Sequence, residues 1–199
     1  MVDSIIFDLD GTLWDASEPI YQYWSRFMPN QTLKSVQKLL GLTIKEMANQ
    51  TGISEEHLQT LQQGENEHLR ANPGKLYAKV IPTLEVLYSK GLKLFIASNC
   101  QSGYIETFLS TKGLSKYFEG HICFGDTKQP KQINVNMLIS QYKLHPIMVG
   151  DTLSDLNAAQ YNHIPFIWVS YGFGQLNWPK RVDNLSDLIL EVSKYEYTK

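Results

Sequence analysis

The chain has 199 residues, 43% of them hydrophobic, which is enough for one core or for one core domain with an insertion. Its 18 Lys and Arg residues nearly balance 20 Asp and Glu residues, so no nucleic-acid or anionic-membrane surface is expected. No apolar run approaches the roughly 20 residues that span a bilayer. Two cysteines, Cys100 and Cys123, and acidic residues near the start, Asp3 and Asp8, predict a reduced, cytoplasmic setting.

Five short segments rich in β-branched or aromatic residues predict buried strands. These segments end at Asp8, at Ser98, near Cys123, at Asp151 and at Ser170. Amphipathic stretches of helical length lie between most of them, and strands that alternate with helices indicate a parallel sheet covered on both faces. The predicted helices cover residues 104–112, 133–143 and 153–161.

The connection after the first predicted strand is too long for a simple crossover. About eighty residues separate Asp8 from the next strand, so an inserted domain is predicted. Ser54 is a predicted helix N-cap inside it, and Pro73-Gly74 and Pro82 mark the return to the sheet. We therefore expect a helical cap at residues 16–80, with residues 1–15 and 81–199 as the core. Helical spacing at the start of the insertion comes from Ile20, Trp24, Phe27 and Met28.

The first motif, IIFDLDGTLWD, places Asp8 and Asp10 at the end of a predicted strand. Two carboxylates this close repel each other unless something positive joins them. A divalent cation with oxygen ligands resolves the repulsion, and the remaining carboxylate can serve as acid and base. The alternative is that Asp10-Gly11 is an ordinary turn after a strand. A calcium-binding loop is disfavoured because Thr12 stands where Asp or Asn is needed.

The second motif, IMVGDTLSD, is another apolar strand that ends on a carboxylate, Asp151, with Asp155 one helical turn later. Thr152 and Asp155 could instead form a capping-box-like helix start without any catalysis. The conjunction of the two motifs favours a site, because ligands of open parallel sheets bind beyond the carboxyl ends of the strands. Asp8, Asp10 and Asp151 all fall at such ends.

Two further elements could hold an anion. In FIASN, Ser98 and Asn99 end a strand, where a hydroxyl and backbone N–H groups suit a phosphate oxygen, although helix capping is an equal alternative. A lysine in GDTKQPKQIN could offset the negative charge. We favour Lys131, which opens a predicted helix, over Lys128 in the preceding loop, and we treat Asp126 as unrelated to the site.

In chain order, these elements resemble the haloacid dehalogenase superfamily, whose motifs are an Asp-x-Asp pair, a Ser or Thr, a Lys and a late acidic pair. DLDGT and GDTLSD are the most specific strings. The long insertion after the first motif looks like the helical cap of that family, and VSYGFG at 169–174 is similar to its phosphoglycolate phosphatase branch. The resemblance implies an α/β fold with a Rossmann-like parallel sheet and an inserted α-helical cap.

The resemblance also implies a mechanism. Asp8 would be the nucleophile that forms an aspartyl phosphate, and Asp10 would protonate the leaving oxygen and then activate water. Mg²⁺ would be held by the Asp8 carboxylate, the Asp10 backbone carbonyl and Asp151.

The other predicted site residues assist Asp8 and Asp10. Ser98, Asn99 and Lys131 would hold the phosphoryl group, and Asp155 would orient Lys131 or a metal-bound water rather than touch the metal. The cap would decide which substrates enter. Its candidate lining residues are Trp14, Tyr21, Trp24 and Lys45.

The predicted function is Mg²⁺-dependent hydrolysis of a small phosphorylated metabolite, such as a phosphoglycolate-like compound or a sugar phosphate, by a monomer or weak homodimer. A phosphomutase of the same superfamily shares every core residue and stays an alternative. A phospho-accepting signalling domain is a distant one, because its acceptor Asp lies on a middle strand and it lacks the insertion. A dehalogenase is disfavoured, since it has no leaving alcohol for Asp10 to protonate.

Overall fold

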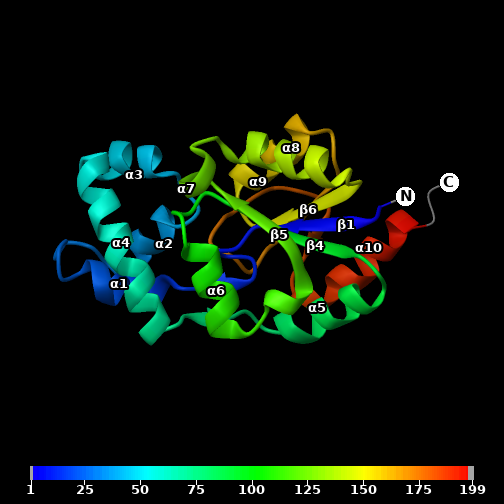
Figure 1. The fold of residues 1–199 in the computed structure, drawn as a ribbon, viewed down its shortest axis with the longest axis horizontal. Helices are drawn as coiled ribbons and strands as arrows, with labels where there is room; N and C mark the ends of the chain where they lie inside the picture. Colours follow the sequence, from blue (N-terminus) through cyan, green and yellow to red (C-terminus); the bar gives the residue numbers. More distant parts are fainter. Residues whose placement is uncertain (1, 197–199) are drawn as a thin grey trace.

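Six parallel strands form the central sheet of the protein, whose computed structural model describes residues 2–196 (Figure 1). The order across the sheet is β5-β4-β1-β6-β7-β8. The chain runs outward from β1 to β4 and β5 on one side, and from β6 to β8 on the other, so β1 lies at the point where the order reverses. The strands are β1 (Ser4–Phe7), β4 (Lys93–Ser98), β5 (Phe118–Cys123), β6 (Pro146–Gly150), β7 (Phe166–Val169) and β8 (Arg181–Val182).

Helices cover both faces of this sheet because both faces of its strands are apolar. In β1, Ile6 packs into a cluster with residues of the helices α8 (Lys131–Tyr142) and α9 (Leu153–Tyr161). Its neighbours Ile5 and Phe7 point to the other face, in line with the two-residue period of a strand. The helices on that face are α5 (Val80–Ser89), α6 (Tyr104–Lys112) and α10 (Leu188–Glu196).

Short elements complete the core. They are the helix α7 (Phe124–Thr127) and two 3-10 helices, Ser115–Tyr117 and Leu185–Asp187.

Four helices lie between β2 (Trp14–Asp15) and β3 (Lys75–Leu76) in the chain and gather at one end of the molecule (Figure 1). They are α1 (Ser17–Trp24), α2 (Leu33–Leu39), α3 (Ile44–Thr51) and α4 (Glu55–Ala71). A short antiparallel ribbon of β2 (Trp14–Asp15) and β3 (Lys75–Leu76) brackets them. We call the four helices the cap; the division of cap and core at residues 16 and 80 stays a prediction.

The observed elements confirm the predicted α/β class. Residues 104–112 and 153–161 are helices with the predicted bounds, and Ser54 caps α4 by accepting a hydrogen bond from the His57 N–H at 3.3 Å. The first cap helix ends at Trp24, so Phe27 lies beyond it and is 52% exposed. Pro82 lies in the first turn of α5, where proline is tolerated.

Two further differences concern length. α8 begins at Lys131 rather than at residue 133, and β8 has only two residues, too few for an alternating pattern to be recognised in the sequence. Within residues 2–196, no helix combines the length and the apolar character needed to cross a membrane.

Candidate active site

Three polar residues meet at the carboxyl edge of the sheet, where the strand order reverses. Asp8 directly follows β1, Asp151 directly follows β6, and Ser98 is the last residue of β4. β1 pairs with both β4 and β6, so the three strand ends are neighbours, and all three side chains are buried. This is the position at which open α/β sheets bind ligands.

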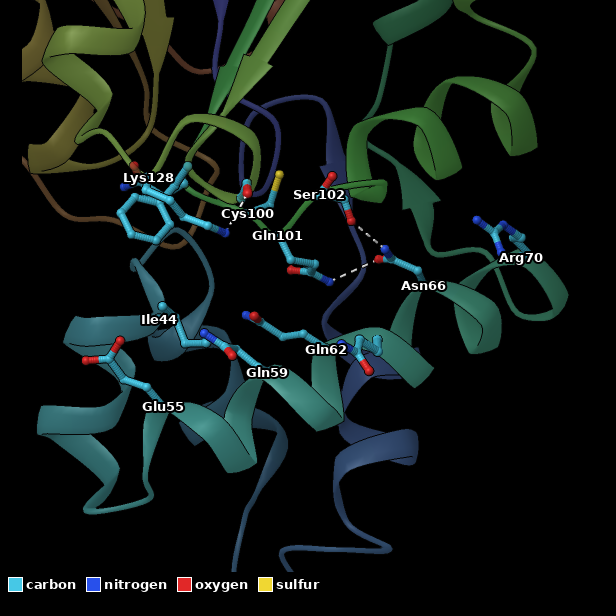
Figure 2. Close-up of a pocket in the computed structure, with 14 residues that line it drawn as sticks. Ile44, Glu55, Gln59, Gln62, Asn66, Arg70, Cys100, Gln101, Ser102 and Lys128 are labelled. Atoms are coloured by element: carbon cyan, nitrogen blue, oxygen red, sulfur yellow. Dashed lines mark hydrogen bonds between the residues drawn. The ribbon is translucent and has the colours of Figure 1, made fainter.

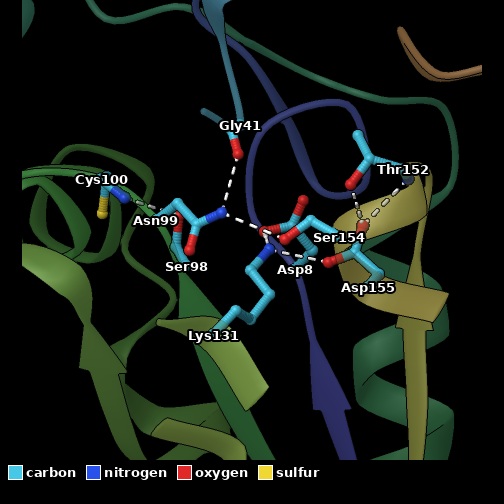
Figure 3. A network of polar contacts seen from close by, with 9 residues as sticks. All are labelled: Asp8, Gly41, Ser98, Asn99, Cys100, Lys131, Thr152, Ser154 and Asp155. Carbon is cyan, nitrogen blue, oxygen red and sulfur yellow. Dashed lines mark hydrogen bonds and ion pairs between the residues drawn. The ribbon is translucent and has the colours of Figure 1, made fainter. Parts of the chain in front are cut away.

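Lys131 joins two of the predicted carboxylates. As the first residue of α8 it is buried, and its Nζ lies 2.7 Å from Asp8 Oδ1 and 2.7 Å from Asp155 Oδ1 (Figure 3). Burial alone would lower the pKa of this amine, but the Asp155 and Asp8 carboxylates raise it above its ordinary value. Lys128, the alternative in the sequence, is exposed and donates to the Gly125 carbonyl. Lys131 is therefore a fixed positive charge beside Asp8.

Asp155 both caps a helix and contacts Lys131, the two roles that the sequence left open. Its Oδ2 accepts hydrogen bonds from the Thr152 backbone N–H at 2.9 Å and from the Thr152 hydroxyl at 2.7 Å, which caps the start of α9. Its Oδ1 accepts from Lys131. Both oxygens of Asp155 are therefore engaged, and the side chain fixes the position of the lysine.

The carboxylates of Asp8, Asp151 and Asp155 offer oxygens that all lie within 4.8 Å of one another. Two buried oxygens of this group, Asp8 Oδ2 and Asp151 Oδ1, have no hydrogen-bond partner among the described residues. The other Asp151 oxygen accepts from the backbone N–H groups of Phe173 at 2.7 Å and Gly174 at 3.1 Å. Buried carboxylate oxygens without a partner, in such a cluster, fit a hard divalent cation.

Gly11 makes the close approach of the two acidic motifs possible. Its φ of +81° suits glycine, and a Cβ at this position would lie 2.2 Å from Asp151 Oδ2. Any larger residue would push the Asp151 side chain out of place.

Burial raises the pKa values of the acidic groups in this cluster. Burial and the neighbouring Asp155 raise the pKa of Asp8 to about 6, although Lys131 opposes the change. Burial together with Asp8 and Asp155 raises the pKa of Asp151 to about 8. The site thus holds more acidic groups than Lys131 can balance, and a bound cation would supply the missing positive charge.

Asp10 lies apart from this cluster and faces the cap. Its side chain is 4% exposed and accepts a hydrogen bond from the Tyr104 hydroxyl at 2.8 Å. Burial and the nearby Asp8 raise the pKa of Asp10 well above its ordinary value. The Asp10 side chain is outside the three-carboxylate cluster; its predicted metal ligand, the backbone carbonyl, stays a prediction.

The two predicted phosphate-binding residues at the end of β4 differ in whether their side chains keep a hydrogen-bond donor for a ligand. Ser98 Oγ accepts from the Cys100 N–H at 3.3 Å and keeps its own hydrogen for donation. The Asn99 amide instead donates its hydrogens to the Gly41 carbonyl at 2.9 Å and to Ser154 Oγ at 3.2 Å (Figure 3). The side chain of Asn99 therefore links the core to the cap.

Sequence reasoning missed a buried carboxyl on the cap side, Glu65. This residue of α4 is 2% exposed, and its oxygens accept from Trp24 Nε1 at 2.6 Å and Gln101 Nε2 at 2.7 Å. Burial raises the pKa of Glu65 to about 7, against the opposing effect of these two hydrogen bonds. No sequence signal could have found Glu65, because it lies among many polar residues of a helix that looks solvated.

Glu65 lines a small cavity beside Asp10, which we call the Asp10 pocket. Its volume is about 20 Å³, room for about one water molecule. The lining comes from both sides of the cap interface: Asp10, Trp24, Leu40, Gly41, Leu42, Met47, Gln62, Glu65, Cys100, Gln101 and Tyr104.

Two larger clefts flank the Asp10 pocket at the junction of cap and core. One, of about 680 Å³, runs between α4 and the loop after β4, and Figure 2 shows Gln62 and Gln101 facing each other in it. The other, of about 630 Å³, reaches Lys131 and the start of α9. Of the predicted lining residues, Trp24 lines the Asp10 pocket, whereas Trp14 belongs to the core and neither Tyr21 nor Lys45 lines these three cavities.

Comparison with known proteins extends this picture. Residues 5–169 match the family model described as haloacid dehalogenase-like hydrolase. A phosphoglycolate phosphatase of Yersinia pestis is 26% identical over 86% of this chain and 82% of its own length. A pyrophosphatase, PpaX, of Oceanobacillus iheyensis is 24% identical over 94% and 95%. The crystal structure of a predicted phosphatase from Clostridium acetobutylicum, 22% identical, superimposes with a TM-score of 0.84 over 98% of this chain and 99% of that one.

Proposed function

The chain belongs to the haloacid dehalogenase-like hydrolases, and we propose that it is a Mg²⁺-dependent phosphatase that transfers the phosphoryl group of a small monoester to Asp8 and then to water. The observation that carries the proposal is the buried contact of Lys131 with Asp8, beside two unpaired carboxylate oxygens at the end of β1. The named relatives act on phosphorylated small molecules.

Asp8 is the nucleophile in this proposal. One carboxylate oxygen attacks the phosphorus, and the bond between phosphorus and the leaving oxygen breaks. Lys131 holds Asp8 at 2.7 Å and supplies positive charge for the phosphoryl oxygens, while the Ser98 hydroxyl donates to one of them. Asp155 keeps Lys131 in place. Positioning and charge stabilisation of this kind account for most of the catalysis of phosphoryl transfer.

Asp10 is the acid and then the base. Burial and the nearby Asp8 raise the pKa of Asp10, which favours the protonated carboxyl, and the proton of this carboxyl goes to the leaving oxygen. The ionised Asp10 then takes a proton from the water that hydrolyses the aspartyl phosphate. The hydrogen bond from Tyr104 holds the carboxyl in one orientation throughout.

Asp8 and Asp151 are the residues that would hold Mg²⁺, because each keeps a buried carboxylate oxygen without a partner. Bound there, the cation neutralises negative charge on the transferred phosphoryl group. The backbone N–H groups of Phe173 and Gly174 orient Asp151 for this task.

The Asp10 pocket supports hydrolysis over the phosphomutase alternative. It has room for about one water molecule beside Asp10, the residue that takes a proton from the attacking water in this proposal. A mutase must also hold a second phosphate, and no Lys or Arg is among the described residues that line the pocket. Glu65 adds negative charge instead.

Phosphate release from a panel of phosphorylated metabolites, with and without Mg²⁺, tests the proposal. We expect Mg²⁺-dependent release that Asp8→Asn abolishes, together with loss of fluoroberyllate binding. Asp126→Asn is the matched control, since Asp126 lies in a similar Gly-Asp-Thr triplet and bonds to Ser102 and Cys123 instead. Turnover that survives in Asp8→Asn would overturn the assignment.

We propose a reducing, cytoplasmic setting for this activity. Cys100 and Cys123 are both free thiols and both buried, which suits a compartment that keeps thiols reduced.

A further inference from the structure

Glu65 is the cap residue whose charge the rest of the site leaves uncompensated. Its two hydrogen-bond donors, the Trp24 indole and the Gln101 amide, are neutral. Among the described residues, no Lys, Arg or His lines the Asp10 pocket, and no ion pair reaches Glu65. The carboxyl is therefore fixed in place without a positive partner.

The leaving group of the substrate lies at this pocket in the proposed reaction. Asp10 lines it, and Asp10 is the group that gives the leaving oxygen its proton in the proposed reaction. A buried acid beside Glu65 would be an anion without a partner, which is strongly unfavourable. An N–H or O–H group could instead donate to the second lone pair of a Glu65 oxygen.

A second polar side chain of the pocket, Gln62, also favours a leaving group that forms hydrogen bonds. Gln62 is 7% exposed, and its amide donates a weak hydrogen bond to Met47 Sδ at 4.0 Å, so it keeps capacity for a hydroxyl. The basic side chains nearby, Arg70 and Lys128, line the 680 Å³ cleft and not the Asp10 pocket; Figure 2 shows them on opposite sides of that cleft.

We propose that Glu65 is a specificity-determining residue that selects small leaving groups which donate a hydrogen bond and carry no negative charge, such as amino alcohols or polyols, over acids such as glycolate. The inference rests on the proposed function, because it assigns the Asp10 pocket to the leaving group. Because the pocket has room for about one water molecule, only the hydroxyl or amino end of that group can enter it.

Three phosphate monoesters of matched length test the proposal: phosphoethanolamine, 2-hydroxyethyl phosphate and phosphoglycolate, with p-nitrophenyl phosphate as the reference. We expect kcat/KM for phosphoglycolate to be at least about tenfold below that of the better of the other two. If phosphoethanolamine has the highest kcat/KM, the preferred leaving group is an amino alcohol. If 2-hydroxyethyl phosphate has the highest kcat/KM, it is a polyol. Either result supports the selection by Glu65.

Glu65→Gln removes the charge and keeps the shape, since the Gln101 amide can turn to match it. In this variant kcat/KM for phosphoglycolate relative to 2-hydroxyethyl phosphate should rise about tenfold. Glu67→Gln, an exposed change on the same helix, should leave that ratio unchanged.

The kcat/KM values of the wild-type protein for the four esters test the inference even if Glu65→Gln fails to fold. Preference for phosphoglycolate, with p-nitrophenyl phosphate also hydrolysed, would overturn the inference and leave the proposed function standing. Absence of Mg²⁺-dependent turnover for all four esters would overturn the proposed function itself.

Discussion

The sheet edge and the Asp10 pocket both bury carboxyl groups, but they hold them differently. At the sheet edge, Lys131 bridges Asp8 and Asp155 at 2.7 Å each, and the groups come from strand ends and the helix that follows. In the pocket, Glu65 comes from a cap helix and has only neutral donors. The edge is built around charge pairing, whereas the pocket leaves a charge available to a ligand.

This difference separates chemistry from selection. The groups at the edge serve any phosphate monoester, because they touch only the phosphoryl group. The groups of the pocket meet the part of the substrate that varies. Changes at the edge should therefore impair all substrates alike, and changes in the pocket should alter their ranking.

The largest effect should follow from removing the positive charge at the edge. Lys131→Met leaves the buried carboxylates of Asp8 and Asp155 without a positive partner, so the free energy of unfolding should fall by about 3–5 kcal/mol. Lys128→Met, a change of an exposed lysine nearby, should have little effect. Urea denaturation of both variants measures the difference. Equal stability of the two variants would show that the Lys131 bridge contributes nothing to folding.

The next effect concerns the pocket and pH. The pKa of Glu65 is raised from 4.5 to about 7 in the folded protein, so the protonated form favours folding, and this stability is lost as the pH rises from about 4.5 to about 7. A pKa difference of this size corresponds to about 3 kcal/mol. Glu65→Gln never ionises, so the stability of the wild type relative to this variant should decline over that interval. Parallel pH profiles of the two proteins would contradict the burial of an uncompensated charge.

Metal affinity should separate the two late aspartates. Asp151 keeps an unpaired oxygen, whereas both oxygens of Asp155 are already bonded. Calorimetry should therefore show that Asp151→Asn weakens Mg²⁺ binding by more than about 100-fold and Asp155→Asn by about 10-fold. Asp126→Asn serves as the control. The reverse ranking would exchange the roles of Asp151 and Asp155.

The edge could be predicted from the sequence because its residues follow strand ends. An apolar run that stops at Asp8 or at Asp151 fixes where the carboxylate lies, since parallel strands end at a common edge. The pocket could not be predicted in this way. Glu65 looks like any polar residue of a solvated helix, and its burial depends on how the cap packs against Gln101, a contact between residues 36 positions apart.

The same limit applies to other residues. Phosphate binding by Asn99 stays a prediction, and the contact of its amide with Gly41 of the cap is one that local sequence does not reveal. Strand β8 was missed because two residues carry no period. Local patterns predict what a strand or helix is, and long-range packing decides what its side chains touch.

Rapid quench of Asp10→Asn tests the central claim most directly, namely a phosphoryl transfer to Asp8 assisted by Asp10. A nitrophenolate leaves without protonation, whereas an alkoxide does not. With p-nitrophenyl phosphate we expect a burst of about one nitrophenol per enzyme, slow turnover afterwards and phosphate on the peptide that contains Asp8, because the base of the second step is missing. An alkyl phosphate should give almost no burst. Equal loss of the first step with both esters, and no phosphate on Asp8, would contradict the account.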